Sequence, residues 1–140
     1  MTAGLWASVL PASCQLPASY FAERFCNLDG RGTLIVDASS KWGFFVTVIT
    51  LSHDLINGTD DPQWNTTADR PVIVRANAWI CSGAWLYNCE IGEGAVVAMG
   101  TVVRSQIVAP HVMVAGNPAQ VIARFVDGQW HYKRRDRMLV

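Results

Sequence analysis

The sequence predicts an all-β fold, a parallel β-helix in which short strands and tight turns alternate. Two observations carry this prediction: apolar residues recur at an interval of six, and small residues follow them at a fixed distance. A period of six fits neither an amphipathic helix, with about 3.6 residues per turn, nor a long alternating strand. It fits a short strand followed by a turn, in which each strand places one apolar side chain inward.

The clearest stretch of the repeat lies between residues 74 and 103. Its apolar anchors stand six, six, five, six and six residues apart: Val74, Ile80, Leu86, Ile91, Val97 and Val103. A small residue follows most anchors four positions later: Ala78, Ala84, Ala95 and Thr101. Val36, Trp42 and Val48 repeat the six-residue step in an earlier, weaker stretch. We expect the anchors to stack into a continuous core, where each fully buried Val, Leu or Ile contributes about 1.5–3 kcal/mol.

The turns between such short strands need residues that tolerate unusual backbone angles. Gly83, Gly92, Gly94 and Gly100 supply them. Three strand–turn units make one triangular coil, and a coil cannot bury its stacking face alone. We therefore expect residues 1–140 to form a single domain of cooperating coils.

Three segments are expected to lie outside the repeat. Residues 1–33 show no six-residue period, and within them Ser19 to Asn27 suggest a short helix. Residues 54–71 are polar and predict an excursion loop, a feature that is more often functional than structural in a compact repeat. Residues 104–115 are expected to lead out of the repeat into a short C-terminal extension, 116–140.

Composition limits the partners of the chain. Its formal net charge is zero, which argues against nucleic acid because binding phosphates needs surplus Lys and Arg. No apolar run reaches the 18 or so residues of a membrane span. Only 16% of the residues are charged and 51% are apolar, so we expect part of the surface to be covered by other subunits.

The four cysteines predict neither a metal site nor a disulfide framework. Cys14, Cys26, Cys81 and Cys89 form no C-x-x-C pair and no zinc-ligand spacing. Free thiols in a reducing compartment are the simplest interpretation, so we expect a cytoplasmic protein that needs no metal.

Three passages resemble the hexapeptide-repeat acetyltransferases, above all the polysaccharide-biosynthesis members and the maltose and galactoside O-acetyltransferases. They are residues 42–54 (WGFFVTVITLSHD), 74–103 and 114–122 (VAGNPAQVI), and the last is the most specific. The resemblance implies a left-handed β-helix and a homotrimer with active sites at the subunit seams. It also implies transfer of an acetyl group from acetyl-CoA to a hydroxyl of a sugar or polysaccharide precursor.

The resemblance further implies that His53 is the general base, since the family's catalytic histidine stands just before the excursion loop. A hydroxyl is a poor nucleophile until its proton is removed as it attacks the thioester, and general base catalysis by imidazole contributes about 10²–10⁴ in rate. Successive side chains in an extended chain point to opposite faces, so we expect Asp54 to fix the loop rather than to orient His53. His111 and His131 match nothing in the family and are expected to be structural.

Other roles follow from the same resemblance. The acceptor is expected to contact loop residue Asp54 and the indole of Trp79. Backbone N–H groups near Ser82 and Gly83 are expected to polarise the thioester carbonyl. The remaining contacts to coenzyme A would come from small residues along the pantetheine arm and from basic residues at the phosphates: Ala98, Gly100, Thr101, Arg104 and Arg124.

Several alternatives stay open. The chain could be an N-acetyltransferase acting on an amino sugar, or a non-catalytic β-helix for assembly or carbohydrate binding. A zinc hydratase of similar fold needs three histidines around one metal. The three histidines here are far apart in the sequence, which argues against that chemistry.

Overall fold

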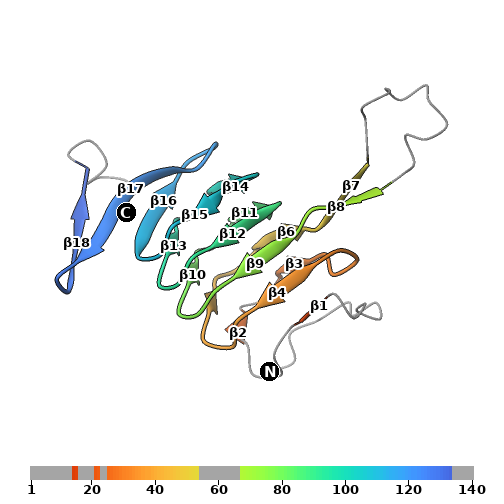
Figure 1. Ribbon diagram of the computed structural model, residues 1–140, viewed down its shortest axis with the longest axis horizontal. Coiled ribbons are helices and arrows are strands. Elements are labelled where there is room, and N and C mark those ends of the chain that lie inside the picture. Colours follow the sequence, from red (N-terminus) through yellow and green to blue (C-terminus); the bar gives the residue numbers. More distant parts are fainter. Residues whose placement is uncertain (1–13, 16–20, 23–24, 54–66, 134–140) are drawn as a thin grey trace.

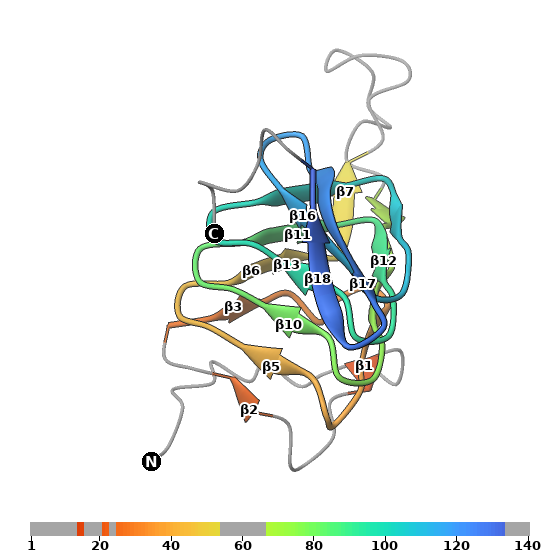
Figure 2. The ribbon, with the colours of Figure 1, turned by 90° about the vertical axis from the view of Figure 1, so that its left-hand side faces the viewer.

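The computed structural model describes residues 14–15, 21–22, 25–53 and 67–133. The parallel strands of the coil form three sheets, one on each side of a triangle, as seen along the coil in Figure 2. No helix is found among these residues, which confirms the all-β fold class. None of them therefore belongs to a helix long and apolar enough to span a membrane.

Each face of the coil is one sheet. The first face contains β1 (Cys14–Gln15), β4 (Leu34–Val36), β9 (Val72–Val74), β12 (Cys89–Ile91) and β15 (Ile107–Val108). The second contains β2 (Phe21–Ala22), β5 (Lys41–Trp42), β10 (Trp79–Ile80), β13 (Val96–Val97) and β16 (Val112–Ala115). The third contains β3 (Asn27–Leu28), β6 (Thr47–Ile49), β11 (Trp85–Tyr87) and β14 (Val102–Arg104).

The predicted anchors form the core of the coil. All nine are buried, with exposed fractions of at most 4%. Pairing in register stacks them from coil to coil, as in the column Val48, Leu86 and Val103 on the third face. The small residues four positions after the anchors, from Ala78 to Thr101, are also fully buried, because they line the inside of the corners.

The corners explain the glycine pattern. Gly83, Gly94 and Gly100 have positive φ angles of 73°, 62° and 68°. Gly92 does not, but a Cβ there would lie 2.5 Å from the backbone nitrogen of Pro110, so close approach of two coils requires the glycine. Asn88 alone (φ 46°) joins β11 to β12, which accounts for the five-residue step between Leu86 and Ile91.

The N-terminal segment, whose sequence shows no six-residue period, contributes a coil. Strands β1, β2 and β3 pair in parallel with β4, β5 and β6. The helix predicted for Ser19 to Asn27 is wrong, because Phe21–Ala22 and Asn27 lie in strands of this coil. Of its described residues, Cys26 and Leu28 pack against the core and both are only partly buried, so the apolar period is too weak to read from the sequence.

The C-terminal end of the coil also differs from the prediction. The chain does not leave the repeat after Val103, because β15 and β16 continue the first and second faces. The extension then folds back as β17 (Gln120–Val126) and β18 (Gln129–Tyr132), which pair antiparallel with β16 and with each other. Figure 1 shows these two strands at the opposite end of the molecule from β1.

The excursion begins and ends as a two-stranded ribbon that projects from the coil (Figure 1). β7 (Leu51–His53) pairs antiparallel with β8 (Thr67–Asp69), so that His53 lies opposite Thr67. Part of the predicted loop is therefore strand. Residues 54–66, including Asp54, lie outside the described residues.

Candidate functional site

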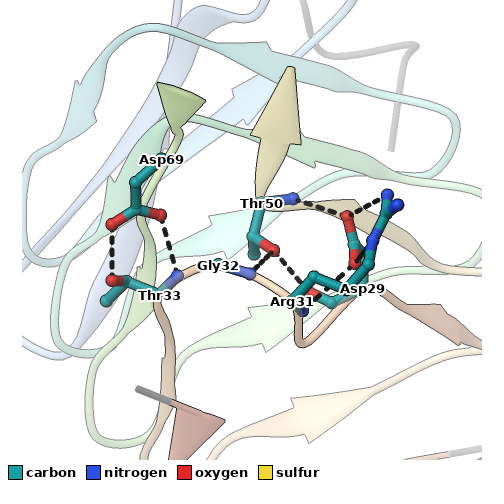
Figure 3. A network of polar contacts seen from close by, with 6 residues as sticks. All are labelled: Asp29, Arg31, Gly32, Thr33, Thr50 and Asp69. Atoms are coloured by element: carbon teal, nitrogen blue, oxygen red, sulfur yellow. Dashed lines mark hydrogen bonds and ion pairs between the residues drawn. The ribbon is translucent and has the colours of Figure 1, made fainter. Parts of the chain in front are cut away.

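A polar clasp fixes the base of the ribbon that carries His53 (Figure 3). On one strand, the Asp69 carboxylate accepts hydrogen bonds from the backbone N–H of Thr33 at 2.8 Å and from its hydroxyl at 2.6 Å. These bonds hold the pKa of Asp69 below its ordinary value. Just before the other strand, the Thr50 hydroxyl donates to the carbonyl of Asp29 at 2.7 Å and accepts from the N–H of Gly32 at 2.9 Å. Both strands are thus fastened to residues 29–33.

The segment that receives the ribbon is itself held in shape. Arg31 binds the Asp29 carboxylate through two nitrogens, at 2.8 and 3.1 Å, and this contact lowers the pKa of Asp29. A side chain at Gly32 would collide with the carbonyl oxygen of Thr50. Short-range packing therefore sets the direction in which the ribbon leaves the coil. Because His53 is the last residue of β7, the same packing fixes its position.

Ser52, the residue before His53, contacts a different part of the site. His53 is exposed, whereas the hydroxyl oxygen of Ser52 is buried. Ser52 lies beside the phenol of Tyr87 and lowers its pKa, with further contributions from Arg70 and Arg104. The Ser52 hydroxyl makes no hydrogen bond of standard geometry within the described part of the chain. The base of β7 thus borders a positively charged region of the third face.

That region is a groove with a volume of about 600 Å³. Its lining includes Arg70, Trp85, Tyr87, Asn88, Arg104 and Ser105. The Nε–H of Arg70 donates to the Tyr87 phenol at 3.1 Å, and Tyr87 is paired in register with Arg104 on the next coil. Of these residues only Arg104 was expected at a functional site. Trp85 and Tyr87 occupy outward positions of β11, where the apolar period carries no signal, and Arg70 lies in the predicted excursion just after β8.

The residues expected to bind acetyl-CoA line the corner between the second and third faces, here called the thioester corner (residues 82–83 and 98–101). The backbone N–H of Gly83 is already bonded to the carbonyl of Phe44 at 2.9 Å. The backbone N–H of Ser82 makes no hydrogen bond to any described residue, and its nitrogen lies close to Gly43, where an added Cβ would approach it to 2.6 Å. Thr101 is fully buried, whereas Met99 and Gly100 of the later turn are exposed, so a ligand here would meet the Met99 side chain and the backbone of Gly100.

The expected site residues do not all meet within one chain. The strands of the third face begin at the thioester corner and end at the corner from which β7 departs. Ser82 and His53 are therefore separated by at least the length of β11, roughly 10 Å at the usual rise per residue. Arg124 lies on β17 in the second sheet, away from Arg104 on the third face.

Trp79 is also separated from the ribbon. Its indole, 52% exposed, lies on the second face beside a cavity of about 330 Å³. His111 and Trp130 line the same cavity. An acceptor held there would not touch His53 of the same chain.

Neither cysteine near the site is set up for covalent catalysis. Burial raises the pKa of Cys81 and raises that of Cys89 to about 12, and the thiolate rather than the thiol is the nucleophile. Within the described ranges, no three His, Cys, Asp or Glu side chains gather in a way that could hold a metal ion.

Comparison with known proteins establishes the fold. No protein-family model matches the chain. A Schizosaccharomyces pombe protein provisionally named serine acetyltransferase is 30% identical over 92 residues, which is 65% of this chain but 29% of that protein. The chain thus spans less than a third of this curated relative.

Two solved structures have the same fold at low identity. A maltose O-acetyltransferase from Clostridium difficile superposes with a TM-score of 0.67 at 23% identity, covering 77% of this chain and 57% of that one. A galactoside acetyltransferase in complex with coenzyme A gives 0.65 at 19% identity, covering 87% and 68%. The chain has the left-handed hexapeptide-repeat β-helix fold of these acetyltransferases.

Proposed function

We propose that this chain is an acetyl-CoA-dependent acetyltransferase that acts on a hydroxyl of a sugar or polysaccharide precursor. The observation that carries the proposal is the placement of His53, an exposed imidazole on a clasped ribbon where the excursion leaves an acetyltransferase-type coil. The maltose and galactoside enzymes of the same fold favour a sugar hydroxyl as the acceptor.

The reaction would proceed by direct attack. His53 takes the proton of the acceptor hydroxyl while its oxygen forms a bond to the thioester carbonyl, and negative charge builds on the carbonyl oxygen. A backbone N–H aimed at that oxygen stabilises it, and Ser82 offers such a group. The intermediate then breaks its carbon–sulfur bond, and the imidazolium returns the proton to the departing thiolate of coenzyme A.

The acetyl-CoA contacts follow from the thioester corner. Gly100 presents an open surface, because a Cβ there would meet no atom within 4 Å. The pantetheine arm can lie against this backbone beside Ala98. Arg124 is the exposed basic residue that we assign to the phosphates. Trp79 offers an indole face to a sugar ring, and Asp54 follows the base in the loop.

A homotrimer would bring the separated groups together, because His53 of one copy could meet Ser82 of the next. Large apolar side chains that need a cover lie at and beside the thioester corner: Phe25 (72% exposed), Phe44 (43%), Phe45 (61%) and Met99 (78%). Light scattering is expected to give three times the mass of the 15.4 kDa chain. A monomer mass across a wide concentration range would contradict this part of the proposal.

The proposed activity is tested by following thiol release from acetyl-CoA with a panel of hexoses, uronic acids and amino sugars. We expect release that depends on the acceptor, together with a product that has gained one acetyl group as an ester. Release no faster than hydrolysis with every acceptor would refute the proposal. An amide product on the amino sugars would favour the N-acetyltransferase alternative.

A further inference from the structure

We propose that the groove on the third face binds a negatively charged group of the acceptor, a carboxylate or a phosphate, between Arg70 and Arg104. The inference rests on the proposed function and names the class of acceptor, an acidic saccharide.

Two arginines line the groove without a direct ion pair to a described carboxylate. Arg31 and Arg75 each pair with a carboxylate at 2.8 Å. Arg70 and Arg104 form no ion pair with any described carboxylate, although both line the groove. The carboxylate of Asp69, the residue before Arg70, is hydrogen-bonded to Thr33, and the side chain of Arg70 acts on it only through a weaker electrostatic attraction. Two guanidinium groups facing one cavity favour an anion, since Arg binds carboxylate and phosphate oxygens through paired N–H donors.

The groove also has the size and the side chains to hold a sugar. Tyr87 and Arg104 are partners on adjacent coils, about 4.8 Å apart along the axis, and Arg70 reaches the same phenol from the end of β8. A volume of about 600 Å³ falls within the range of small-ligand sites. Trp85, 48% exposed, flanks the groove with an indole that a sugar ring can stack on. The guanidinium groups of Arg70 and Arg104 can bind the anionic group of an acidic sugar, while the indole of Trp85 stacks on its ring.

The groove lies close to the catalytic base, which favours the acceptor over coenzyme A as its ligand. Ser52, which borders Tyr87, is the residue immediately before His53. A general base must reach the hydroxyl that it deprotonates, so a group bound here lies at the reacting end of the site. The phosphates of coenzyme A lie far from its thioester, at the other end of an extended pantetheine arm. Arg104 therefore fits the acceptor better than the cofactor phosphates to which the sequence resemblance assigned it.

The position of Ser52 supports the same assignment. Its buried hydroxyl lies against the phenol of Tyr87, which lines the groove. Side chains of Ser52 and His53 leave opposite sides of β7. A saccharide that crosses the edge of β7 would place its anionic group in the groove and its reacting hydroxyl at His53.

The test is equilibrium binding by calorimetry without coenzyme A, using galactose, galacturonate and galactose 1-phosphate as matched probes. We expect at least one acidic probe to bind about tenfold to a hundredfold more tightly than galactose. Arg104→Gln should remove this preference, and Arg104→Lys should retain part of it. The control, Arg75→Gln, removes an exposed charge paired with Glu90 and should leave binding unchanged.

Acetyl-transfer kinetics on the same variants distinguish the two proposals. A raised KM for the acidic acceptor with an unchanged KM for acetyl-CoA supports the groove assignment. Equal affinity for all three probes, including no binding of any, overturns it, as does a change that falls on acetyl-CoA or on the oligomer mass. Tight binding of an acidic probe without any transfer leaves the groove assignment standing and refutes the proposed function instead.

Discussion

Two buried threonines should respond in opposite ways to the same substitution. Thr50 and Thr101 are both fully buried. The hydroxyl of Thr101 has no hydrogen-bond partner among the described residues, and a buried hydroxyl without a partner costs about 1–3 kcal/mol. Valine has nearly the same shape without the hydroxyl. Thr101→Val should therefore raise the free energy of unfolding by about 1 kcal/mol or more.

Thr50→Val removes a hydroxyl that is fully used. It loses the bond to the Asp29 carbonyl and takes away the acceptor of the Gly32 N–H. We expect the free energy of unfolding to fall by about 1–3 kcal/mol. In a chain of this length, each kcal/mol corresponds to a shift of about 3–5 °C in Tm.

The assay is urea unfolding of the three proteins at one protein concentration, because association alters apparent stability. The midpoints should move in opposite directions at an unchanged denaturant slope. A destabilised Thr101→Val protein would show that its hydroxyl is satisfied and that the geometry of this corner is misjudged.

Other perturbations follow from single contacts. Gly92→Ala should destabilise the coil severely, because its Cβ would meet the backbone of the next coil at 2.5 Å, whereas Gly100→Ala should cost only about 1 kcal/mol for its positive φ; equal unfolding midpoints would refute this contrast. The lowered pKa of Asp69 means that its bonds to Thr33 stabilise the clasp above the ordinary value of 3.8 and are lost as the pH falls through the folded value. Asp69→Asn should therefore flatten the loss of stability below about pH 4, and an unchanged acid profile would argue against the clasp. Cys89, with its pKa raised to about 12, should resist alkylation in the folded protein at neutral pH, as mass spectrometry can show; rapid labelling would contradict its burial.

Most of the fold could be predicted from the sequence, because burial requires an apolar residue at every inward position and these positions recur every six residues. A side chain such as Val97 or Leu86 can serve as an anchor only if it is apolar, so the six-residue step marks the inward positions. The first coil was missed because few of its residues carry this signal. Phe25, for example, takes a positive φ in a corner and leaves its ring 72% exposed.

The site was readable only in part. The resemblance placed His53 at the exit of a coil, and the structure finds it there on β7. The clasp joins Thr33 to Asp69 across 36 residues, and no local sequence pattern predicts such a long-range contact. Tyr87 faces outward on β11, and Arg70 follows the ribbon outside the repeat, so the six-residue period does not determine which residue stands at either position. In this fold the functional side chains stand at outward positions, so the structure is needed to show which of them lie together.

The measurement that tests the central claim most directly is the turnover number of His53→Ala with acetyl-CoA and the best acceptor, compared with that of His131→Ala. His131 is an exposed residue of β18, far along the chain from the ribbon, and serves as the matched control. We expect His53→Ala to lose at least about a hundredfold in kcat with an unchanged unfolding midpoint, and His131→Ala to match the wild type. Thiol release by His53→Ala at a rate close to that of the wild type would contradict the account.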